Sequence, residues 1–172
     1  MADKLVNKIL GIFSGLATLA YGKELLIFII SLLPILELRG GLIAAALLGV
    51  NPVPAYIISI VGNIIPVPLI LLFITKIMDA MRKSKVGVFN KFVTWLDKKV
   101  EKNKTQIEKY GYWGLVLFVG IPLPGTGAWT GCLIASVLEL DKKKSFGACI
   151  LGIFLASIIM MTITYLIPAL IK

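Results

Sequence analysis

Two long apolar stretches of this chain are each interrupted by proline and then by a run of small residues. The first, LIFIISLLPILELRGGLIAAALLG, covers residues 26–49, and the second, GLVLFVGIPLPGTGAWTGCLIASVL, covers residues 114–138. When the second is shifted back by 90 positions, Pro124 falls on Pro34 and Gly131 falls on Gly41. Apolar helices broken at corresponding positions of two halves are typical of substrate sites in membrane transporters.

The composition is that of a membrane protein. Of the 172 residues, 58% are hydrophobic and only 16% are charged, whereas a typical soluble domain carries about 25% charged residues. The chain has no histidine and two isolated cysteines, so the usual general base and the usual metal-ligand clusters are missing. We therefore predict an integral membrane protein that is not an enzyme and holds no metal or other cofactor.

Segment lengths predict which parts cross the membrane. A spanning helix needs about 20 apolar residues, and segments 52–75 and 145–171 meet this requirement. The interrupted segments 25–50 and 112–140 consist of limbs of about half that length, 25–33 and 41–50 in the first and 112–121 and 131–140 in the second. Each is predicted to form a re-entrant helical hairpin with its break near the middle of the membrane. The alternative is one long kinked helix in each position.

Loop charge predicts the orientation. Residues 76–109 contain ten basic and four acidic residues, a net charge of +6. Such a run is typical of a cytoplasmic loop under the positive-inside rule and favours contact with anionic lipid head groups rather than with nucleic acid. A second basic loop, 141–144, is also predicted to be cytoplasmic. The first hairpin then enters the membrane from outside and the second from the cytoplasm.

Helical apolar stripes precede both hairpins, which completes a repeated unit. We predict an all-α inverted repeat of amphipathic helix, re-entrant hairpin and transmembrane helix, in a single membrane domain. Repeat 1 covers about 4–75, the basic loop with its amphipathic helix covers 76–110, and repeat 2 covers about 86–171. Whether the N-terminal helix spans the membrane or lies in its interface stays open. The stripes are Leu5, Ile9, Ile12, Leu16 and Leu19, and Val86, Phe89, Val93, Leu96 and Val100.

The hairpin tips are the predicted substrate site. In each hairpin the second limb begins near mid-membrane, where its unsatisfied N–H groups and helix dipole favour an anion. Two charged residues, Glu37 and Arg39, stand at the start of the first such limb. The predicted substrate-binding residues are Glu37, Arg39, Gly40, Gly41, Thr126, Gly127, Trp129 and Thr130, and the predicted hairpin breaks are Pro34, Pro122, Pro124 and Gly125.

Other roles for these residues stay open. Glu37 is either the partner of Arg39 or a proton-coupled switch, and the pair could simply join the two tips by satisfying backbone groups. The glycines favour close helix packing more than a substrate path. Trp129 either covers the pocket or fills space beside the opposite tip.

The motifs LPILELRGGLIAAALLG and GIPLPGTGAWTGCLIAS, with the proline-bearing helix between them, resemble the small multi-drug export protein family. The resemblance extends over nearly the whole chain and implies a transporter-like membrane protein. That family is in turn similar to the DedA/VTT (SNARE-associated) superfamily, whose members are linked to lipid movement. Members of this superfamily carry acidic residues around the first hairpin, and Glu37 matches these in kind. They also carry arginines near the second hairpin, which here has no charge.

The expected function is a small transporter or flippase-like protein that moves an anionic amphiphile or lipid-linked phosphate through a midplane site. One alternative is proton-coupled export of small cationic amphiphiles with Glu37 as the binding carboxylate. Another is a membrane-shaping or assembly factor that transports nothing. We expect a multi-pass protein of the prokaryotic plasma membrane. Two full spans make a thin bundle, so a homodimer is a further expectation.

Overall fold

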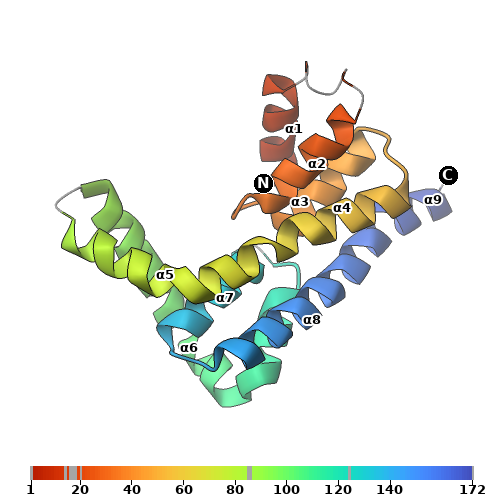
Figure 1. Cartoon of the computed structure of the whole chain (residues 1–172). Coiled ribbons are helices and arrows are strands. Elements are labelled where there is room, and N and C mark those ends of the chain that lie inside the picture. The colour runs from red at the N-terminus through yellow and green to blue at the C-terminus, as the bar shows by residue number, and fades with distance from the viewer. Residues whose placement is uncertain are drawn as a thin grey trace.

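The computed structural model describes residues 2–13, 15, 19, 21–84, 87–123 and 125–171, and within these ranges every regular element is a helix (Figure 1). The apolar content that predicted a membrane protein is carried by these helices. In chain order they are α1 (Ala2–Ile12), α2 (Gly22–Leu32), α3 (Glu37–Leu47), α4 (Pro52–Ile64), α5 (Pro66–Lys83), α6 (Gly87–Gly120), α7 (Ala128–Val137), α8 (Lys142–Met161), a π-helical turn (Thr162–Leu166) and α9 (Ile167–Ile171).

The first interrupted segment forms two antiparallel helices, not one kinked helix. Helices α2 and α3 pack together, and Lys23 at the start of α2 donates a hydrogen bond of 2.9 Å to the carbonyl of Leu48 after the end of α3. Pro34 lies exposed in the turn between them. Helix α3 begins at Glu37, four residues before the predicted limb, because Gly41 lies inside the helix. There it allows close packing, since a Cβ on it would overlap the hydroxyl of Ser31.

The second interrupted segment repeats this arrangement. Helix α6 is broken at Gly111, whose φ of 53° and ψ of −127° are not helical, and its second part runs on to Gly120. After the turn of residues 121–127, α7 begins at Ala128, three residues before the predicted limb. The reason is again a glycine within the helix: Gly131 lies against the side chain of Val119 on α6.

The ends of the two hairpins correspond at an offset of 90 positions. A residue with positive φ follows the second limb of each hairpin: Gly49, with a φ of 67°, in the first and Glu139, with a φ of 53°, in the second. The next helices then start at Pro52 and Lys142. The two C-terminal caps have the same pattern of three backbone hydrogen bonds, each from an N–H to a carbonyl. In the first cap these run from Leu48 to Ala44, from Gly49 to Ala46 and from Val50 to Ala45. In the second they run from Leu138 to Ile134, from Glu139 to Ser136 and from Leu140 to Ala135.

Among the residues that the structure describes, two continuous helical rods are long and apolar enough to cross a membrane: Pro52–Lys83, with 32 residues, and Lys142–Leu170, with 29. The first consists of α4 and α5, which meet at Ile65. Proline has no N–H to donate, so Pro66 and Pro68 interrupt the hydrogen bonding there, while Ile65 keeps helical φ and ψ of −53° and −44°. This rod extends past the predicted end at residue 75 into the basic segment.

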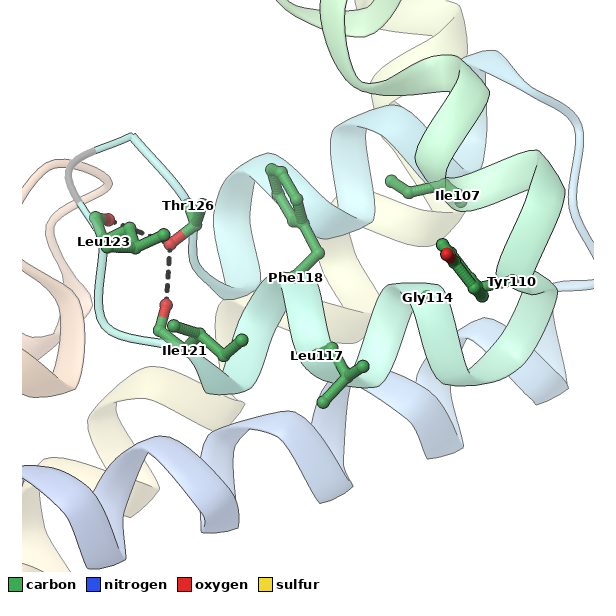
Figure 2. Close-up of a pocket in the computed structure, with 8 residues that line it drawn as sticks. All are labelled: Ile107, Tyr110, Gly114, Leu117, Phe118, Ile121, Leu123 and Thr126. Carbon is green, nitrogen blue, oxygen red and sulfur yellow. Dashed lines mark hydrogen bonds between the residues drawn. The ribbon is translucent and has the colours of Figure 1, made fainter.

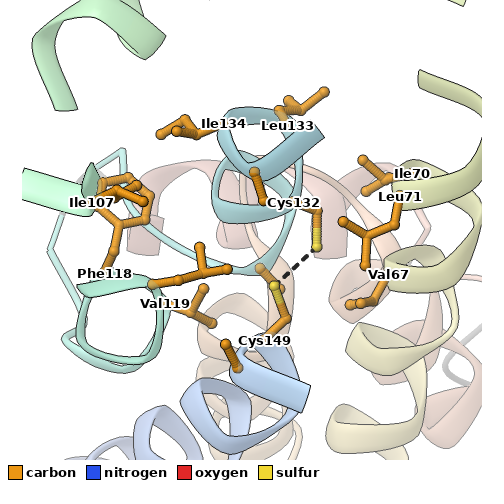
Figure 3. Packing of buried hydrophobic residues seen from close by; sticks show 14 of the residues in the cluster. Val67, Ile70, Leu71, Ile107, Phe118, Val119, Cys132, Leu133, Ile134 and Cys149 are labelled. Carbon is orange, nitrogen blue, oxygen red and sulfur yellow. Dashed lines mark hydrogen bonds between the residues drawn. The ribbon is translucent and has the colours of Figure 1, made fainter. Parts of the chain in front are cut away.

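Helix α8 joins the cores of the two units. Near its start, Cys149 and Ile153 belong to the main buried cluster between α5, α6, α7 and α8, where Cys149 Sγ lies 3.2 Å from Cys132 Sγ (Figure 3). Farther along, Ala156 and Met160 belong to a cluster with residues of α2, α3 and α4. The hairpin of α2 and α3 packs on α4, whereas α7 packs on α5. The two hairpins are therefore held on one shared pair of rods.

The predicted amphipathic stripes are buried only in part. Val93 and Val100 of α6 are each 5% exposed and share the main cluster with Met78 of α5, while Phe89 is exposed. At the N-terminus, Val6 of α1, which was not a residue of the predicted stripe, is fully buried in a cluster with residues of α2 and α3, while Ile12 and Leu19 of the stripe are 67% and 61% exposed. Val86 and Leu16 lie outside the described residues. Buried valines thus attach α1 and the first part of α6 to the two units, and part of each stripe stays exposed.

Candidate functional site

The side chain of Glu37 joins the first hairpin to the start of α7. Its carboxylate accepts hydrogen bonds of 3.0 Å from the backbone N–H groups of both Ala128 and Trp129. Glu37 is only 5% exposed. The first N–H groups of a helix have no partner within the helix and carry its positive dipole end, which favours a negative charge. Glu37 therefore occupies the anion position of α7.

Gly127 makes room for this carboxylate. Its φ of 135° is a conformation that other residues rarely adopt. A Cβ at this position would lie under 3 Å from the carboxylate carbon and both oxygens of Glu37. Gly127 was predicted to bind substrate, and in the structure it packs directly against Glu37.

Arg39 binds the opposite end of the same turn. Its Nη1 donates to the carbonyl of Leu123 at 2.6 Å, and its Nη2 donates to the carbonyl of Ile121 at 3.3 Å and to Oγ1 of Thr126 at 3.1 Å. The Thr126 hydroxyl also lies 2.9 Å from both of those carbonyl oxygens. The guanidinium thus faces the carbonyls that follow α6, which carry the negative end of a helix dipole.

Together, the two side chains place a negative charge against the N–H groups and a positive charge against the carbonyls of the second hairpin tip. Glu37, at the first residue of α3, faces the positive end of α7. Arg39, two residues later, faces the carbonyls after α6. Residues two apart on a regular helix do not lie side by side, which suits side chains that reach two different ends of one turn. The tips meet, as the predicted pocket required, and the second tip contributes mostly backbone groups.

The backbone of Glu37 lies in an unusual conformation. Its φ is 51°, in the left-handed region that is uncommon for residues with a Cβ. Such strain costs of the order of 1–3 kcal/mol and is often found at functional sites. Helix α3 therefore starts in a conformation that directs this carboxylate towards α7 at some cost in stability.

The other predicted residues lie around this junction in different roles. Gly40 packs beside Leu36 and Ile30, and Gly41 packs beside Ser31 and Ser59, so both serve helix packing. Thr130 is buried in α7, and none of the hydrogen bonds above involves it. Trp129 contributes its backbone N–H, while its indole Nε1 is buried without a hydrogen-bond partner. Pro122 and Gly125 lie in the turn, and Pro124 lies outside the described residues.

Sequence reasoning missed the groups that Glu37 and Arg39 bind. These are the N–H groups of Ala128 and Trp129 and the carbonyls of Ile121 and Leu123. Every residue carries such groups, so no residue type marks them. The only signal available was the proline-rich break, which predicts backbone groups without helical partners nearby.

The arrangement can hold and release an anion through electrostatics and hydrogen bonding. In the part of the chain that the structure describes, no group of three or more His, Cys, Asp or Glu side chains is placed to hold a metal ion. The described tip offers a buried carboxylate, a guanidinium, a threonine hydroxyl and helix-end N–H groups. These groups can form charge-assisted hydrogen bonds.

The comparisons with known proteins agree with a membrane location. A family model described as "Putative small multi-drug export protein" matches residues 37–159, from Glu37 into α8 and including the second tip. No curated protein and no solved structure matches the chain. The family is described as one of export proteins, and two helices among the described residues are able to cross a membrane by length and composition. Together these findings indicate a membrane transporter rather than an enzyme. The match covers more than two thirds of the 172 residues, and the chain therefore belongs to the "Putative small multi-drug export protein" family.

Proposed function

We propose that the protein moves an anionic amphiphile across the membrane and that the junction of the two hairpin tips is its substrate site. The observation that carries this proposal is the position of Glu37. A carboxylate of the protein itself occupies the anion position at the start of α7, with two N–H donors at 3.0 Å. An incoming phosphate or carboxylate has the chemistry to take its place.

Transport then proceeds by exchange of anions. The substrate head group displaces Glu37 from the N–H groups of Ala128 and Trp129 and gains attraction from the nearby Arg39. Loss of the hydrogen bonds to Glu37 weakens the connection between the two hairpins, while Arg39 still binds the carbonyls of Ile121 and Leu123. The tips can then separate and expose the head group to the other side. When the substrate leaves, Glu37 returns and closes the junction.

The proposal includes two inverted re-entrant hairpins as the moving parts. It is supported by the matching caps at an offset of 90 positions and by tips that meet through Glu37 and Arg39. Irregular backbone is tolerated at mid-membrane depth only where protein or water covers it, and here side chains of the first tip satisfy backbone groups of the second. The unequal loop charges favour a cytoplasmic opening for the second hairpin.

The basic face of α6 is proposed to contact anionic lipid head groups. Lys91 and Lys98 are exposed, while Val93 and Val100 on the same helix are buried against the protein. Each lysine near an anionic surface contributes of the order of 1 kcal/mol. This face would concentrate anionic amphiphiles at the cytoplasmic opening of the second hairpin.

A second candidate function is proton-coupled export of small cationic amphiphiles. The buried carboxylate of Glu37 favours it, because a protonated Glu37 loses its charge interaction with the start of α7 and could exchange its proton for a cation. Replacement by Gln abolishes pH-driven export under this proposal. Unchanged export by Glu37→Gln rules it out.

The leading proposal is tested by transport of a fluorescent alkyl phosphate in liposomes that contain only the purified protein. Arg39→Ala is expected to reduce the rate at least about tenfold, the effect of losing a single charge-assisted contact. Arg82→Ala is the matched control, because Arg82 pairs with Asp97 in an exposed salt bridge away from the tips. Equal rates for Arg39→Ala and the unaltered protein would overturn the proposed site.

A further inference from the structure

An apolar groove of about 270 Å³ runs along α6 beside the second hairpin tip (Figure 2). Ile121, Leu123 and Thr126 lie at one end of it, and Ile107 and Tyr110 lie at the other. Leu117 and Leu123 are 48% and 55% exposed. In a membrane, exposed apolar side chains face lipid, so the groove opens sideways to the bilayer.

Each end of the groove carries a cation. At the tip, Arg39 donates hydrogen bonds to the Thr126 hydroxyl and to the Leu123 carbonyl. At the far end, Lys109 Nζ lies 5.3 Å from the centre of the Tyr110 ring. None of the eight lining residues is acidic. Apolar walls between two cations complement an apolar chain with a negative head group.

We infer that this groove binds one hydrocarbon chain of an anionic amphiphile taken directly from the lipid, with Lys109 as the first position of the head group and Arg39 as the second. The inference rests on the proposed function and adds the substrate class and its path. The groove volume lies just below the range of about 300–1,000 Å³ for small-molecule sites, which suits one chain rather than two. Residues 112–120, the part of α6 beyond the break at Gly111, cover about 13 Å of helix, or somewhat under half the hydrocarbon thickness, so the head group moves from the interface towards mid-membrane.

Photolabelling tests the groove without relying on transport. The probe is a single-chain alkyl phosphate with a diazirine on its chain, added to the purified protein in phosphatidylcholine liposomes, and the labelled residues are mapped by mass spectrometry. We expect saturable labelling of residues 107–123, displaced by excess unlabelled alkyl phosphate. An alkyl alcohol of the same chain length should label these residues roughly tenfold less, because it lacks the charge.

Two variants narrow the groove in different ways. Leu117→Trp adds bulk at the exposed rim, and Gly114→Leu fills the wall from within; each should reduce the saturable labelling by roughly tenfold or more. Gly11→Leu is the matched control, because a Cβ on Gly11 of α1 meets nothing within 4 Å, and it should label normally. Lys109→Gln should weaken labelling by the phosphate but not by the alcohol.

The outcomes separate this inference from the proposed function. Labelling spread evenly over α4, α6 and α8 and not displaced by competitor overturns the groove. Equal labelling by phosphate and alcohol does the same, because it removes the role of the cations. Transport that continues while groove labelling is absent overturns the groove and leaves the transport proposal standing. Saturable groove labelling without any transport overturns the proposed function instead.

Discussion

The carboxylate of Glu37 lies 3.0 Å from the backbone nitrogen of Ala128, 91 positions later in the chain. This contact connects the first residue of α3 to the first residue of α7, and so connects the breaks of two similarly built hairpins. A buried carboxylate supplied by one hairpin satisfies helix-end N–H groups supplied by the other. The stability of the tip junction should therefore depend on this carboxylate.

Removal of the Glu37 side chain should destabilise the protein. Glu37→Ala leaves the N–H groups of Ala128 and Trp129 without their acceptor, and each buried unsatisfied group costs about 1–3 kcal/mol. For a chain of this size, 1 kcal/mol corresponds to roughly 2–4 °C in Tm, which thermal unfolding in detergent can measure. Glu37→Gln keeps one acceptor oxygen and should lose less. Exposed Glu101→Gln is the control, and an equal Tm for Glu37→Ala and Glu101→Gln would contradict the contact.

Glycine at position 37 separates backbone strain from the lost carboxylate. Glu37→Gly removes the same hydrogen bonds as Glu37→Ala, but glycine adopts a φ of 51° without a steric penalty. The glycine variant should therefore be more stable than the alanine variant by about 1 kcal/mol. Chemical denaturation of the two purified variants measures the difference. A less stable glycine variant would show that position 37 is not strained.

A methyl group at position 127 should break the same contact from the other side. Gly127→Ala places a Cβ under 3 Å from the Glu37 carboxylate and forces a φ of 135° on alanine. We expect a loss of Tm at least comparable to that of Glu37→Ala, and a loss in the double variant smaller than the sum of the two single losses, because residues in contact are not additive. Gly147→Ala in α8 is the control, since its Cβ would meet Tyr112 at an ordinary 3.5 Å. Full additivity of Gly127→Ala and Glu37→Ala would argue against a shared contact.

Close packing inside the second hairpin can be tested by rescue. A Cβ on Gly131 of α7 would lie 2.6 Å from Cγ2 of Val119 on α6, and overpacking of this kind costs about 1–3 kcal/mol. Val119→Ala removes that methyl group. The double variant Gly131→Ala/Val119→Ala should therefore be more stable than the sum of the separate effects of Gly131→Ala and Val119→Ala predicts, by about 0.5–3 kcal/mol. Strict additivity in denaturation experiments would place Gly131 away from Val119.

The amino-acid pattern predicted the scaffold better than the contacts of the site. Apolar runs interrupted at Pro34 and near Pro122 predicted two helix–turn–helix segments, because half-length limbs cannot cross a membrane alone. The pattern also marked Glu37 and Arg39 as tip residues, since charges are rare in such segments. It could not show what they bind, because their partners are backbone groups of residues 121–129. Nor could it place the helix starts, because Gly41 and Gly131 look like turn residues and serve as packing positions.

The central claim is that the tip junction is a substrate site reached from both sides of the membrane. Cysteine accessibility tests it most directly. The two native cysteines, which are fully buried, are replaced by alanine (Cys132→Ala/Cys149→Ala), so that each introduced cysteine is the only thiol that can be labelled. Single cysteines replace Ile35 in the first tip, which is exposed, and Thr126 in the second, whose hydroxyl contacts Arg39, and a membrane-impermeant maleimide is added from either side. The account predicts labelling of Ile35→Cys from outside and of Thr126→Cys from the cytoplasmic side, both slowed by an alkyl phosphate. Labelling of both positions from one side only, with no protection by the phosphate, would contradict it.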